Sequence, residues 1–144
     1  MKKLTTLLLV VMLMLFSVSC DILIQSPTKL IELEKYSNMT IDGTTSIEVV
    51  YDYIEGEFNT YEFVIEDQET IEKIMSEIFN TELKDYPDDQ DIDFYQCWIT
   101  VKQGDNEYLI NLAYTSDNYG NRYLCQSQTV CEIIERYIEE NFIQ

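Results

Sequence analysis

Alternation of apolar and polar residues predicts two β-hairpins in this chain. In residues 46–54 apolar side chains occupy every second position, and residues 58–66 repeat the pattern after a Glu-Gly-Glu turn. Residues 94–101 and 108–114 alternate on either side of a second turn that contains glycine. This period of two is typical of strands with one buried face. A further short strand is expected over residues 122–126.

Two segments instead follow the period of an α-helix. Asp67 is the predicted N-cap of the first helix, and a second helix is expected to begin near Thr129, where Glu132 three residues later completes a capping-box pattern. Residues 30–36 fit either a short strand or a helical turn. The apolar stripe of the first helix consists of Ile71, Ile74, Met75, Ile78 and Phe79.

The order of these elements, two strands, helix, three strands, helix, predicts an α+β fold. Consecutive hairpins imply an antiparallel sheet, with both amphipathic helices packed on one of its faces. Hydrophobic residues make up 46% of the chain, against only 4 glycines and 2 prolines, so there is enough apolar surface for a folded core. We expect one α+β domain over residues 30–144.

The first nineteen residues carry the pattern of an export signal. Lys2 and Lys3 precede an apolar run, and small residues then lead to Cys20. The apolar run falls short of the about 20 residues that a membrane-spanning helix needs. Residues 1–19 are therefore interpreted as a signal peptide.

The end of this signal, Phe-Ser-Val-Ser-Cys at residues 16–20, resembles the lipobox of bacterial lipoproteins. The resemblance implies cleavage before Cys20, lipidation of its thiol and a tether over residues 20–29. Ser17 departs from the lipobox, which usually has a large aliphatic residue there, and ordinary secretion is the alternative.

The exported part resembles small lipoproteins of unknown function from low-GC Gram-positive bacteria. The resemblance lies in the lipobox, in residues 61–75, where a strand runs into a helix, and in the terminal amphipathic helix. It implies a domain held by lipid on the extracytoplasmic side of the cell membrane. It supplies no catalytic residue.

Charge limits the partners of such a domain. The chain carries 9 Lys+Arg against 27 Asp+Glu, a formal charge of −18, and removal of Lys2 and Lys3 with the signal lowers it to −20. An acidic surface repels nucleic acid and anionic lipid headgroups and attracts a cationic protein or peptide. The alternative is that the carboxylates only keep the domain soluble. The composition leaves the oligomeric state open.

The chain contains no histidine, which excludes Ser-His and Cys-His nucleophiles and imidazole metal ligands. Paired carboxylates could support a hydrolase, but with 27 acidic residues close pairs arise by chance. Asp89, Asp91 and Asp93 alternate as in a calcium loop, yet Phe94 and Thr100 stand where the EF-hand needs Gly and Glu. We expect a noncatalytic protein without a cofactor or a metal site.

Three cysteines remain beside Cys20. Export permits a disulfide, and any of three pairings is open. Cys125 ends a predicted strand and Cys131 lies at the start of the last helix, so that pair is the easiest to close. Cys97 and the other two equally fit buried free thiols, which behave as small apolar residues.

Trp98, Tyr108 and Tyr119 are candidates for an interface, since both residue types are enriched where proteins meet. The alternative is that these rings cover the second face of the sheet. Together, these patterns predict a membrane-anchored lipoprotein that binds an unidentified ligand without catalysis. A narrower alternative is an inhibitor or immunity protein against a cationic extracellular enzyme, and a carboxylate hydrolase is the third.

Overall fold

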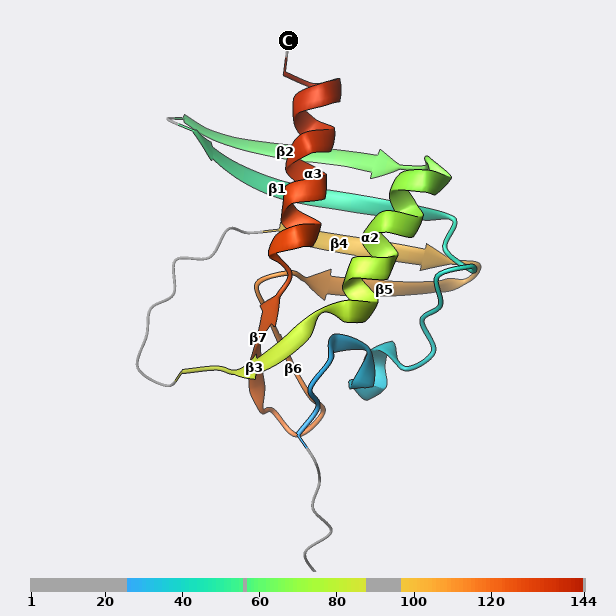
Figure 1. Ribbon diagram of the computed structural model, residues 1–144, viewed down its shortest axis with the longest axis vertical. Helices are drawn as coiled ribbons and strands as arrows, with labels where there is room; N and C mark the ends of the chain where they lie inside the picture. The colour runs from blue at the N-terminus through green and yellow to red at the C-terminus, as the bar shows by residue number, and fades with distance from the viewer. Residues whose placement is uncertain (1–25, 56, 88–96, 144) are drawn as a thin grey trace, which may run out of the picture.

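The computed structural model of the chain describes residues 26–55, 57–87 and 97–143. Its larger sheet is antiparallel, with the strand order β2-β1-β4-β5, and both α-helices lie across the same side of it (Figure 1). The strands are β1 (Ser46–Glu55), β2 (Glu57–Ile65), β4 (Cys97–Gln103) and β5 (Asn106–Asn111), and the helices are α2 (Gln68–Asn80) and α3 (Gln128–Asn141).

A smaller antiparallel sheet, in the order β3-β7-β6, lies beside the larger one (Figure 1). Two short 3-10 helices, η1 and η2, precede β1, and Leu30 of η1 donates its backbone N–H to the Thr81 carbonyl at the end of α2, at 3.0 Å. The bounds are η1 (Leu30–Glu32), η2 (Glu34–Tyr36), β3 (Glu82–Asp85), β6 (Tyr114–Ser116) and β7 (Arg122–Gln126).

This architecture confirms the α+β class, the antiparallel strands, the order of the predicted elements and the placement of both helices on one face. Helix α2 also begins as predicted, because the Asp67 side chain accepts the backbone N–H of Thr70 at 2.9 Å. The Thr70 hydroxyl also donates to the Asp67 carboxylate, at 2.7 Å, and these two hydrogen bonds hold the pKa of Asp67 below its usual value.

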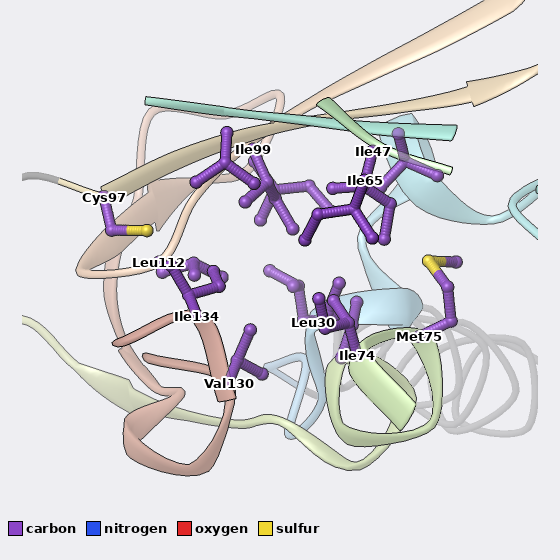
Figure 2. Packing of buried hydrophobic residues seen from close by; sticks show 14 of the residues in the cluster. Leu30, Ile47, Ile65, Ile74, Met75, Cys97, Ile99, Leu112, Val130 and Ile134 are labelled. Atoms are coloured by element: carbon purple, nitrogen blue, oxygen red, sulfur yellow. The ribbon is translucent and has the colours of Figure 1, made fainter. Parts of the chain in front are cut away.

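The core lies between the helices and the inner face of the four-stranded sheet. Ile47, Ile65 and Ile99 point from the strands toward Ile74 of α2 and Ile134 of α3 (Figure 2). All five side chains are fully buried. Burial of each such side chain stabilises the fold by about 1.5–3 kcal/mol, so this layer supplies much of the free energy of folding.

Two strands of the smaller sheet were not predicted. Strand β3 presents only Leu83 as a half-buried apolar side chain, too weak a pattern to indicate a strand. The predicted strand 108–114 ends at Asn111, because the side-chain oxygen of Asn111 accepts the backbone N–H groups of Ala113 and Tyr114. The chain then continues as β6 in the other sheet.

The capping box predicted from Thr129 and Glu132 is wrong. Helix α3 begins at Gln128, and its N-cap is Ser127, two residues before the predicted N-cap Thr129. The Ser127 hydroxyl does not cap the helix, because it donates its hydrogen bond to the backbone carbonyl of Leu112. That contact fixes the start of α3 against the end of the larger sheet.

Within the described parts of the chain, neither α2 nor α3 combines the length and the apolar composition that a membrane crossing requires.

Truncation of Ile74 tests the position of the core. Ile74→Ala is expected to lower the free energy of unfolding by about 2–5 kcal/mol and Ile74→Val by about 0.5–1.5 kcal/mol, because each leaves a cavity in proportion to the atoms removed. Ser76→Ala, at an exposed position of the same helix, is the control and should change it by less than about 0.5 kcal/mol. Urea unfolding followed by circular dichroism measures all three, and equal effects of Ile74→Ala and Ser76→Ala would contradict the packing.

Candidate functional site: the open face of the four-stranded sheet

The outer face of the four-stranded sheet, which we call the open face, is covered by no element among the described residues. Its centre is apolar, because the register places Val50 of β1 directly opposite Trp98 of β4. Side chains directly opposite on antiparallel strands lie about 4.5–5.5 Å apart at Cβ and contact one another. Val64 of β2 and Leu109 of β5 lie farther out on the same face and are 49% and 65% exposed.

Carboxylates surround this centre. Glu48, Asp52, Glu62 and Glu107 share the outward parity of Val50 and Trp98 in the strand register. Lys102 is the basic residue among these outward positions, and its ammonium lies 2.5 Å from Glu48 and 3.5 Å from Glu107. Its hydrogen bond to Glu48, above all, raises the pKa of Lys102. Four carboxylates against one ammonium leave the open face negative.

The open face has the anatomy of a protein interface. Interfaces combine an apolar centre, often with tryptophan, and a polar rim. Carboxylates on such a rim attract lysine and arginine side chains of a partner. The arrangement can therefore bind a basic surface, with Trp98 at the middle of the contact.

The three aromatic residues predicted to form an interface do not lie together. Trp98 is half-buried on the open face, whereas Tyr108 shares the inward parity of Ile110 and packs against the core. Tyr119 is 80% exposed in the turn that connects β6 to β7, where Asp117 accepts its backbone N–H at 2.9 Å. Alternation along β5 separates Tyr108 from Trp98, so only Trp98 belongs to the site.

A cleft of about 800 Å³ lies at the start of α3, and its lining includes Tyr51, Cys131, Glu132 and Glu135. The Tyr51 hydroxyl donates a hydrogen bond to the Glu135 carboxylate. Burial, and then this hydrogen bond, raise the pKa of Tyr51 far above its usual value, so the phenol stays protonated.

The three cysteines have different neighbours. All three described cysteines are free thiols, and the Cys125–Cys131 disulfide, which the sequence left open beside free thiols, is not formed in the structure. The Cys125 thiol donates to the Asn111 carbonyl at 3.6 Å and lies near Lys35. Cys131 instead faces Cys97 at the start of β4, and the contact raises the pKa of Cys97 and lowers that of Cys131.

The acidic loop with Asp89, Asp91 and Asp93 lies outside the described residues. Among the residues that the structure does describe, no group of three or more cysteine or carboxylate side chains is placed to hold a metal ion.

Comparison with protein-family models, curated proteins and solved structures finds no match to this chain. The resemblance of its first twenty residues to a lipoprotein signal therefore stays a prediction.

Proposed function

We propose that the chain is an exported lipoprotein, anchored through lipid on Cys20, whose domain binds a cationic protein on its open face without catalysis. The observation that carries the proposal is the uncovered sheet face, with Val50 and Trp98 at its centre and carboxylates around them. The N-terminal signal pattern, ending at Cys20, supports the location outside the cell.

The physical argument combines a short-range and a long-range interaction. Burying Trp98 and the apolar residues beside it removes nonpolar surface from water, and tryptophans at the centre of an interface are among the residues that contribute most to affinity. Carboxylates such as Glu48 and Glu62 act earlier, because opposite charge steers the partner during encounter and raises the association rate. This second contribution weakens as salt shortens the Debye length from about 30 Å at 0.01 M to about 3 Å at 1 M.

Inhibition of a cationic extracellular enzyme is the narrower form of the same proposal. It requires that the bound enzyme loses access to its substrate, whereas binding alone requires only the open face. Assays of binding and of inhibition on the same enzyme therefore distinguish the two forms.

Replacement of Trp98 tests the site. Full-length protein in nonionic detergent is titrated with three cationic probes, a basic lysozyme, cytochrome c and polylysine, at low and at high salt. We expect binding to at least one probe that weakens with salt, and Trp98→Ala is expected to weaken it by about tenfold or more.

Tyr119→Ala is the matched control, since Tyr119 is a more exposed aromatic residue outside the open face. A second pair of variants compares two changes that each remove one negative charge. Glu62→Gln removes it from the open face, and Glu139→Gln removes it from α3. Absence of binding to all three probes at low salt would refute the proposal. Equal losses within either pair would show that binding does not use the open face.

Replacement of Cys20 tests the anchor. Wild-type protein made in a Gram-positive host is expected to partition into detergent and to incorporate a fatty-acid analogue at Cys20, because several acyl chains hold a protein durably on a bilayer. Cys20→Ser should abolish the label and leave an uncut precursor or a released protein, while Cys125→Ser should label as the wild type does. Unlabelled wild-type protein in the medium, starting downstream of residue 20, would contradict lipidation.

A further inference from the structure

Two thiols far apart in the sequence meet beneath the sheet. Cys97 begins β4 on its inner face and is 1% exposed, and it points into the core cluster (Figure 2). Cys131 lies in the first turn of α3, where its backbone N–H bonds the Ser127 carbonyl at 3.1 Å. Tyr51, which lies opposite Cys97 in the register, bonds to Glu135 one helical turn after Cys131. Tyr51 and Cys131 also line the same cleft at the start of α3, so the Cys97 and Cys131 thiols are close enough to shift each other's pKa.

The surroundings make these thiols unequal. Contact with the Cys97 thiol lowers the pKa of Cys131, although burial and Glu135 oppose the shift. The same contact, together with burial, raises the pKa of Cys97. Cys131 also lines the cleft, whereas Cys97 is 1% exposed. Cys131 is therefore the thiol that a reagent reaches first, and its thiolate is the attacking species. Cys125 is a poor competitor, because burial raises its pKa to about 12.

We propose that Cys97 and Cys131 form a redox pair that closes to a disulfide by exchange with a small disulfide entering the cleft at the start of α3. Cys131 is the thiol that reacts first, and Cys97 is the thiol that resolves the intermediate. The proposal rests on the contact between the two thiols and on the position of Cys131 in the cleft, and it is independent of the proposed binding function.

The exchange takes two steps. The Cys131 thiolate attacks one sulfur of the small disulfide, which forms a mixed disulfide on Cys131 and expels one thiolate. Cys97 then gives its proton to a thiolate or to water and attacks the sulfur of Cys131, which forms the Cys97–Cys131 bond and expels the second thiolate. The protein dithiol is oxidised by two electrons, and the small disulfide is reduced to two thiols.

The lining of the cleft selects the class of disulfide. Glu132 and Glu135 lie beside Cys131, so an anionic disulfide is repelled and an uncharged or cationic one is favoured. The disulfide of 2-mercaptoethanol is uncharged and small, and it therefore serves as the probe.

The experiment uses the full-length chain with Cys20→Ser, which leaves three thiols, reduced and then freed of reductant in nonionic detergent. After incubation with the disulfide of 2-mercaptoethanol, free thiols are alkylated and peptides are analysed by mass spectrometry. We expect a link between Cys97 and Cys131, a protein lighter by two hydrogen atoms before alkylation, and alkylated Cys125. The link joins β4 to α3, so it should also raise the urea midpoint of unfolding.

Single variants separate the two roles. Cys97→Ser should accumulate the mixed disulfide on Cys131. In Cys131→Ser the reaction with the small disulfide should be slower by about tenfold or more. Cys125→Ser is the matched control and should close at the wild-type rate. The disulfide mapping by mass spectrometry uses only the Cys20→Ser chain, so it tests the proposal even if one of these single variants does not fold. A link that includes Cys125, a mixed disulfide that forms first on Cys125, or persistence of free Cys97 and Cys131 under conditions that oxidise the urea-unfolded chain would overturn the proposal.

Discussion

The packing of α2 and α3 against one face of the four-stranded sheet is the interaction on which the rest of the structure depends. Isoleucines from both layers meet there, among them Ile47, Ile99, Ile74 and Ile134 (Figure 2). Because successive residues of a strand point to opposite faces, fixing the inner face also fixes the outer one, and a slip of one residue would exchange them. The exposure of Trp98 is therefore a consequence of the burial of Cys97 and Ile99.

The elements with strong local periodicity could be predicted from the sequence. The stripe containing Ile71, Ile74 and Ile78 indicated α2, and alternation indicated the strands of the larger sheet, since in each case burial on one side leaves a repeating pattern. Strand β3 has no such pattern, and it exists because Glu82 through Asp85 pair with β7, more than a quarter of the chain away. Pairing of this kind depends on tertiary contacts and leaves no local signal.

The site was predictable only in part for the same reason. Trp98 was a candidate from its residue type. The alternation within β1 and β4 puts Val50 and Trp98 on outward positions of their strands. Which strands pair, and therefore which outward residues meet, is a property of the sheet order β2-β1-β4-β5. The contact between Cys97 and Cys131 likewise depends on how α3 is seated, which the hydrogen bond from Ser127 to Leu112 helps to determine.

Helix α3 contacts the larger sheet through both its first and its last turns. Its first turn brings Cys131 to Cys97, and its last turns carry Tyr137, whose ring stacks on Phe63 of β2 with centroids 5.3 Å apart. Both contacts are on the inner face, opposite the surface proposed for the cationic partner. Strand β4 connects the two sites, because Cys97 and Trp98 are consecutive residues on opposite faces.

The most direct test of an open, acidic sheet face is the quenching of tryptophan fluorescence in the free protein. Trp98 is the chain's single tryptophan, so the emission reports this face alone. The structure predicts quenching by acrylamide. Relative to the quenching of a free tryptophan amide, quenching at low salt should be stronger by caesium than by iodide, because the surrounding carboxylates concentrate cations and repel anions. Emission that none of the three agents quenches, or relative quenching by iodide equal to that by caesium, would contradict the account.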